Sequence, residues 1–278
     1  MTKAQSITGM RSALKWAGGK KKIISEIASL LPRKGKKRLV EPFVGGGSVF
    51  LNLEFDEYLL VDMNKDLINL FNIIKNQSSD FIKDAQKFFN EDNNQSEKYY
   101  SYRSQFNQSV DQYERSLLFL YLNRHGYNGL CRYNKSGGYN VPFGRYKHPY
   151  FPKAELQYFS KKAQKATFIQ GDFETAFAQL NETDVVYCDP PYSPINPTSN
   201  FTAYAGNSFT DEDQKRLVDY AETAKKNNIP TLISNHYVDF TQDLYQDATK
   251  KKLINVQRSI SRKGKGRIKV KEILALYE

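Results

Sequence analysis

Short apolar runs bounded by turn residues alternate with longer amphipathic segments along most of the chain. The runs with a strand pattern cover residues 38–43, 57–62, 166–173, 184–189, 229–235, 252–260 and 268–277. Segments 20–31 and 211–227 instead repeat their apolar residues at helical spacing. This alternation is typical of βα units and predicts an α/β fold built on a largely parallel sheet.

One stretch, residues 64–149, interrupts the alternation. Helical patterns cover three of its segments, residues 64–76, 96–108 and 114–123, and a polar loop rich in glycine and tyrosine follows them. No strand pattern occurs in this stretch. We therefore expect a discontinuous α/β domain of residues 1–63 and 150–278, with residues 64–149 inserted as a smaller helical domain.

Composition narrows the class of protein. Hydrophobic residues make up 40% of the 278 positions and charged residues 26%, which is ordinary for a folded protein. Because 41 lysines and arginines face 30 acidic residues, the net charge is +11, which attracts polyanions such as nucleic acid. The longest apolar run, Leu117–Leu122, is too short to cross a membrane. Two cysteines and no apolar signal core near the N-terminus lead us to expect a cytoplasmic protein.

The tetrapeptide Asp189-Pro190-Pro191-Tyr192 directly follows an apolar strand. Ligands of α/β sheets bind outside the carboxyl ends of the strands. Two prolines fix the backbone and remove two N–H donors, which leaves carbonyl acceptors exposed at the strand tip. The Asp189 carboxylate and the Pro190 carbonyl can together accept both hydrogens of an amino group, and Tyr192 offers a stacking face. We interpret the tetrapeptide as a pocket for an amino-bearing heterocycle or amide, rather than a plain surface turn.

A glycine turn, residues 45–47, joins the strand at 38–43 to a helical segment, and Asp62 ends the next strand. Glycines at such a turn let the backbone approach a ligand, and an acid at the following strand tip can accept hydrogen bonds from ribose hydroxyls. An adenosine-containing cofactor fits this pattern. Phe50 stands where a dinucleotide-binding motif has its third glycine, so a diphosphate ligand is disfavoured.

The segment Lys15–Lys20 resembles a phosphate loop only superficially. That motif needs glycine where Leu14 stands and serine or threonine where Lys21 stands. Trp16, the only tryptophan of the chain, could cover a cofactor ring, while a core tryptophan flanked by solvated lysines is an equally good interpretation.

Two segments have the composition of a nucleic-acid surface. In the loop 124–145, arginine, asparagine and tyrosine side chains interleave, and these residue types read base edges or wedge between base steps. The run 258–271 carries seven basic residues around two glycines and could lie on phosphates. In each case a solvated segment without a ligand is the alternative.

With these elements in order, the chain closely resembles the Dam-type DNA adenine-N6 methyltransferases, bacterial and phage enzymes that act on GATC. The motifs that carry the resemblance are LKWAGGK (14–20), EPFVGGGSVF (41–50), LNRHGYNGLCRYN (122–134), NVPFGRYKHPYF (140–151), VVYCDPPY (185–192), NFTAY (200–204) and RSIS (258–261). They span nearly the whole chain, and their order is that of the family's α group. One departure is His125, which stands where a family member can carry tyrosine.

The resemblance implies a class I methyltransferase fold, with a Rossmann-like seven-stranded mixed sheet and a small helical target-recognition domain. It implies S-adenosylmethionine as cofactor. Together with the glycine turn, it predicts cofactor binding by Trp16, Lys20, Phe43, Gly45, Gly47, Asp62, Asp172, Phe173 and Asp189. It implies DNA contacts for Lys15, Tyr127, Asn128, Leu130, Arg132 and Arg145.

The leading hypothesis is a monomeric enzyme, acting near the nucleoid, that flips adenine out of double-stranded DNA. Asp189, Pro190 and Tyr192 would then do the catalytic work without a metal, because no His or Cys pair stands at ligand spacing. Methylation of RNA adenine or protein glutamine is the nearest alternative. A non-catalytic DNA-binding protein and a nicotinamide-dependent oxidoreductase are two others, disfavoured by the intact tetrapeptide and by Phe50.

Overall fold

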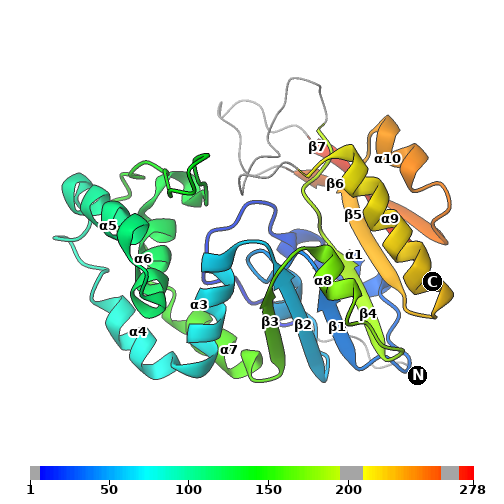
Figure 1. Cartoon of the computed structure of the whole chain (residues 1–278), viewed down its shortest axis with the longest axis horizontal. Coiled ribbons are helices and arrows are strands. Elements are labelled where there is room, and N and C mark those ends of the chain that lie inside the picture. The colour runs from blue at the N-terminus through cyan, green and yellow to red at the C-terminus, as the bar shows by residue number, and fades with distance from the viewer. Residues whose placement is uncertain (1–6, 195–208, 258–268) are drawn as a thin grey trace.

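The computed structural model describes residues 7–194, 209–257 and 269–278. Within them, seven strands form one sheet in the order β3-β2-β1-β4-β5-β7-β6 (Figure 1). The strands are β1 (Arg38–Glu41), β2 (Glu57–Asp62), β3 (Ala166–Gln170), β4 (Asp184–Cys188), β5 (Thr231–His236), β6 (Lys250–Gln257) and β7 (Lys269–Tyr277). The pairs among β1 to β5 are parallel, whereas β7 is antiparallel to β5 and to β6. The predicted α/β fold with a seven-stranded mixed sheet is confirmed.

The described helices number ten, with two short 3-10 helices, η1 (Lys20–Ile23) and η2 (Tyr127–Gly129). They are α1 (Ile24–Leu30), α2 (Ser48–Asn52), α3 (Lys65–Asn76), α4 (Ser78–Gln86), α5 (Ser96–Gln108), α6 (Gln112–His125), α7 (Lys153–Ala163), α8 (Phe173–Phe177), α9 (Asp211–Lys226) and α10 (Asp239–Leu244). Four of them, α4, α7, α8 and α10, were not among the helical segments expected from the sequence.

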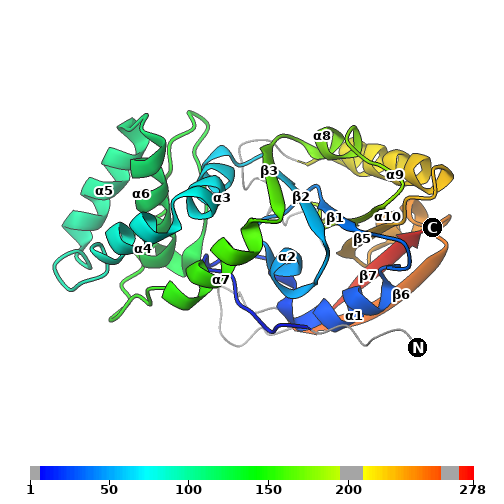
Figure 2. The ribbon, with the colours of Figure 1, turned by 90° about the horizontal axis from the view of Figure 1, so that it is seen from below.

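Helices cover both faces of the sheet (Figure 2). Because side chains alternate along a strand, Leu39 and Val40 of β1 enter different hydrophobic clusters. The cluster around Leu39 includes side chains from α1, α2, α3 and α7, and the cluster around Val40 includes side chains from α8, α9 and α10. The strand order reverses between β1 and β4, so a crevice for ligands is expected at the carboxyl ends of these two strands.

The inserted helices α3 to α6 form the left part of Figure 1. The hydrophobic cluster around Leu39 continues into these helices through buried Phe71, Phe106 and Phe119. Residues 64–149 contain only two isolated β-bridges and no strand, as expected from the sequence. Since the cluster runs across the junction, the boundary at residue 64 stays a prediction. In the described part of the chain, no helix is both long and apolar enough to span a membrane.

Candidate active site

Asp189 lies at the carboxyl end of β4, and donors from two distant segments hold its carboxylate. The buried Lys20 ammonium of η1 forms an ion pair with Oδ2 at 2.7 Å. The Ser234 hydroxyl of β5 lies 3.0 Å from Oδ1. The structure thus brings together Lys20 and Asp189, two residues that the sequence placed in one site.

Tyr192 completes the cluster. Its ring centroid lies 4.7 Å from the Lys20 ammonium and 4.7 Å from the centroid of the His236 ring, which meets it edge-on. Its hydroxyl donates to Glu272 Oε2 at 3.3 Å. Burial, and then the nearby carboxylates of Asp189 and Glu272, raise the pKa of Tyr192 well above its ordinary value. The phenol therefore keeps its proton at neutral pH and presents an aromatic face rather than a charge.

Residues at the end of β5 hold the turn that follows the tetrapeptide. Asn235 Oδ1 accepts a hydrogen bond from the Ser193 amide at 3.0 Å, and His236 Nδ1 donates to the Ser193 carbonyl at 2.7 Å. Gln214 of α9 donates to the Pro191 carbonyl at 2.8 Å and accepts from Asn235 at 3.1 Å. The sequence did not identify these residues as part of the site, because Asn235 and His236 reach the turn only through the pairing of β4 with β5, and Gln214 reaches it from α9.

Asp62 is the last residue of β2, and its carboxylate contacts the glycine turn that follows β1. Its Oδ2 accepts from the Gly45 amide and its Oδ1 from the Asn64 amide, both at 2.9 Å. Burial raises the pKa of Asp62, and the two amide donors oppose that shift. Gly45 has a φ of +48°, in the left-handed region that favours glycine. The predicted neighbours Asp62 and Gly45 are thus in contact at the switch point of the sheet.

Trp16 packs on the glycine turn. A Cβ atom at Gly45 would lie 2.8 Å from the indole Nε1, and one at Gly46 would lie 2.8 Å from the Trp16 Cβ. Trp16 is only partly buried and also packs against the hydrophobic cluster around Leu39. The indole therefore packs on the core and also lies beside the turn, and its role in covering a cofactor ring stays a prediction.

Phe43 and Phe173 face each other across the ends of β1 and β3. Their rings stack with centroids 5.9 Å apart. Asp172 is exposed and caps α8 by accepting from the amide and the hydroxyl of Thr175, each at 3.0 Å. The structure thus gives the predicted cofactor residue Asp172 a helix-capping role and leaves its side chain at the surface.

Four of the predicted DNA-contacting side chains are exposed, namely Tyr127, Asn128, Arg132 and Arg145, and Leu130 is half-buried. Arg132 donates to Asn140 through Nε at 2.7 Å and through Nη2 at 3.2 Å. Asn128 and Arg145 have φ angles of +53° and +55°. Such backbone conformations cost energy for residues other than glycine and are concentrated at functional sites.

Lys15 anchors the loop 124–145 to the rest of the site. Its backbone N–H and carbonyl both bond the Asn123 side chain at 2.8 Å, and its ammonium donates to the Arg124 carbonyl at 3.1 Å. Gly129, with a φ of +61°, leaves room for the Lys15 side chain, which a Cβ would meet at 2.1 Å. Burial, and then the Arg124 charge, lower the pKa of Lys15 to about 8. The segment 15–20 therefore contacts the loop, the glycine turn and Asp189.

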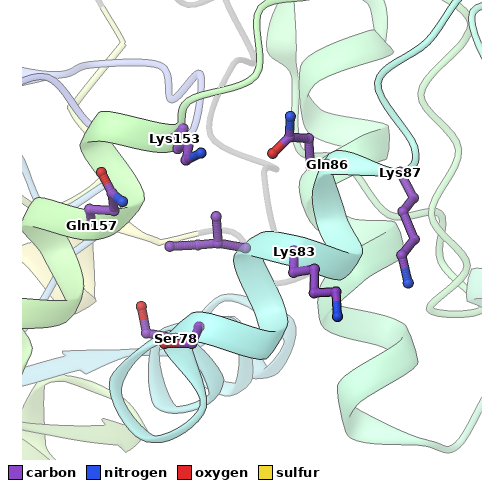
Figure 3. Close-up of a pocket in the computed structure, with 8 residues that line it drawn as sticks. Ser78, Lys83, Gln86, Lys87, Lys153 and Gln157 are labelled. Atoms are coloured by element: carbon purple, nitrogen blue, oxygen red, sulfur yellow. The ribbon is translucent and has the colours of Figure 1, made fainter.

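A separate hollow of about 650 Å³ lies between α4 and α7, with Lys83 and Gln86 on one side and Lys153 and Gln157 on the other (Figure 3). None of the predicted site residues lines it. In the part of the chain that the structure describes, no group of three or more His, Cys, Asp or Glu side chains is placed to hold a metal ion. The motif at 200–204 and the run 258–268 lie outside the described residues.

Comparison with known proteins identifies the family of the chain. Residues 16–260 match the D12 class of N6 adenine-specific DNA methyltransferases. The chain is 53% identical to a DNA adenine methylase of Vibrio cholerae serotype O1 over 268 residues, which cover 96% of each chain. It is 52% identical to the DNA adenine methylase of Escherichia coli K12, covering 96% of this chain and 95% of that one.

An α/β sheet with the tetrapeptide Asp189–Tyr192 at a strand tip fits an amino-group methyltransferase, the class that the family match shows. The chain belongs to the D12 class N6 adenine-specific DNA methyltransferases. It transfers a methyl group to N6 of adenine in DNA. Membership of this family supports DNA adenine methylation over the alternatives of an RNA or protein methyltransferase, a non-catalytic DNA-binding protein and a nicotinamide-dependent oxidoreductase.

Proposed function

We propose that this enzyme uses S-adenosylmethionine to methylate adenine in double-stranded GATC sites, after flipping the base into a pocket formed by Asp189, Pro190 and Tyr192. The observation that carries the proposal is the cluster of Asp189, Tyr192 and Lys20 at the carboxyl end of β4. Recognition of GATC is supported by the curated relatives, each named a DNA adenine methylase, together with the motifs of the loop 124–145.

The donor set at the switch point fits the cofactor. The partly exposed Asp62 carboxylate suits the ribose hydroxyls, and the rings of Phe43 and Phe173 lie beside the place for adenine. The Lys20 ammonium suits a carboxylate of the methionine part, and Trp16 lies beside the glycine turn. When bound, the cofactor supplies a methyl group activated by positively charged sulfur.

The chain's own residues orient the amine. The Pro191 carbonyl is already engaged by Gln214, which leaves the Pro190 carbonyl as the proposed partner of the Asp189 carboxylate. Together they accept the two N6 hydrogens and direct the nitrogen lone pair toward the methyl group. Tyr192, kept neutral by its raised pKa, provides the stacking face for the flipped base.

Asp189→Ala removes one of the two acceptors while leaving the loop 124–145 intact. We expect methyl transfer to GATC duplexes to fall by about a thousandfold or more, with duplex affinity changed by less than about threefold. Asp189→Asn, which keeps one oxygen acceptor, should lose less. Methyl transfer from labelled cofactor, measured on GATC and on duplexes with one base pair changed, tests both parts of the proposal. Activity of Asp189→Ala within tenfold of wild type would refute the assigned chemistry.

A further inference from the structure

The geometry points to Ser234 as a positioning residue for Asp189, acting as the middle member of a buried hydroxyl chain that runs from Tyr187 through Ser234 to Asp189. Ser234 is fully buried in β5. Its Oγ lies 3.0 Å from Asp189 Oδ1, 3.0 Å from the Tyr187 hydroxyl and 3.3 Å from the Cys188 carbonyl. This inference rests on the proposed role of Asp189.

The number of protons available decides which group donates in each hydrogen bond between Tyr187, Ser234 and Asp189. A serine hydroxyl has one proton to donate, and a carboxylate or a carbonyl can only accept. The charged Asp189 oxygen is nearer than the Cys188 carbonyl, so Ser234 donates to Asp189. Tyr187 is almost completely buried, and burial keeps the pKa of its phenol well above the ordinary value. Tyr187 therefore donates to Ser234, which makes Ser234 a better donor to Asp189.

The consequence concerns the rotation of the Asp189 carboxylate. Ser234 of β5 donates to Oδ1 of Asp189, and Lys20 of η1 pairs with Oδ2. Helix η1 lies on the side of the sheet that carries α1 and α2. Lys20 is also a proposed cofactor ligand, so its bond to Asp189 is open to exchange when ligands bind. Ser234 is not a proposed cofactor ligand, so its bond to Oδ1 holds the carboxylate plane when Lys20 turns to a ligand. A wrongly oriented Asp189 carboxylate slows methyl transfer without weakening the binding of DNA or cofactor. Loss of Ser234 is therefore expected to affect the chemical step.

The test compares Ser234→Ala with Thr231→Val in the full-length enzyme. Thr231 is a matched control, because it lies on the same strand, is fully buried, and its hydroxyl makes no hydrogen bond within the described residues. We expect Ser234→Ala to slow single-turnover methyl transfer by about ten- to a hundredfold, with affinities for duplex and cofactor within about threefold of wild type. Thr231→Val should stay within about twofold of wild type in all three quantities.

Tyr187→Phe keeps the test decisive if Ser234→Ala folds poorly. Without Tyr187 to orient it, Ser234 can turn toward the Cys188 carbonyl, so a loss of about two- to tenfold is expected. The double variant Tyr187→Phe/Ser234→Ala should be no slower than Ser234→Ala, because the Tyr187 hydroxyl acts only through Ser234. Additive losses, a wild-type rate in Ser234→Ala, or equal losses of affinity and rate would overturn the inference. An active Asp189→Ala enzyme would instead refute the proposed function itself.

Discussion

Glu41, at the end of β1, is a buried carboxyl group close to the active site. It is 2% exposed, and its Oε1 makes no hydrogen bond within the described residues. Burial raises its pKa well above the ordinary value of 4.5, the Phe50 amide opposes this shift, and the charge of Asp189 adds to it. Glu41 therefore keeps its proton to a higher pH in the folded protein than in the unfolded chain.

This difference makes stability depend on pH. A carboxyl whose folded pKa is raised contributes stability that is complete below the unfolded pKa and is lost as pH rises toward the folded value. Glu41→Gln removes the titration but keeps a neutral side chain of the same shape. Relative to this variant, we expect wild type to lose up to about 1.4 kcal/mol of unfolding free energy per pH unit above pH 4.5. Denaturant unfolding of both proteins from pH 5 to 8 measures the difference. If the unfolding free energies of wild type and Glu41→Gln change in parallel with pH, folding does not raise the pKa of Glu41.

At the scale of elements, the contact between Trp16 and the glycine turn joins the N-terminal segment to the end of β1. Gly46→Ala would place a Cβ 2.8 Å from the Trp16 Cβ and 3.2 Å from the Ser12 hydroxyl. We expect this overpacking to destabilise the protein by about 1–3 kcal/mol. The only tryptophan of the chain should also change its fluorescence, since the indole must move.

Gly138→Ala is the control for that experiment. Its added Cβ would meet the Asn134 side chain at 3.4 Å, an ordinary van der Waals distance, so we expect a change below about 0.5 kcal/mol. Thermal unfolding followed by tryptophan emission compares the two variants. Equal stability and equal emission in both would mean that Trp16 does not rest on the turn.

The sequence predicted elements well where their pattern was sharply bounded, although α4 and α7, of nine and eleven residues, were missed. The segments 57–62 and 96–108 match β2 and α5 residue for residue. The missed helices α8 and α10 have five and six residues, too few for a helical repeat to show. Among site residues, Asp189, Tyr192 and Lys20 carried motif signals. Ser234 and Asn235 did not, because only the pairing of β4 with β5 brings them to the tetrapeptide.

At the scale of the whole molecule, two contributions to DNA binding need to be separated. One is attraction by the net charge of +11, and the other is recognition of the base sequence by a particular surface. The segment 15–20 links the loop 124–145 to Asp189, so the loop that carries the exposed Arg132 is anchored beside the candidate active site. Lys83 lies on α4, at the lower edge of Figure 1, whereas the loop that follows α6 lies toward the upper edge. Helix α4 with Lys83 and the loop that carries Arg132 therefore lie apart in this view, and the two residues carry the same charge.

Arg132→Ala and Lys83→Ala therefore remove equal charge with different expected results. A guanidinium has five N–H donors, and Asn140 takes two of those of Arg132, which leaves donors for a base edge. We expect Arg132→Ala to cost about 1–3 kcal/mol on GATC and to relax discrimination at one base pair. Lys83→Ala should leave both the affinity and its salt dependence unchanged, because its charge lies away from the bound duplex. Methylation rates on GATC and its single-base variants, with duplex affinities at several salt concentrations, measure these effects. If Arg132→Ala instead slows every duplex equally and flattens the salt dependence by about one charge, then Arg132 binds phosphate, and sequence readout belongs to its neighbours in the loop.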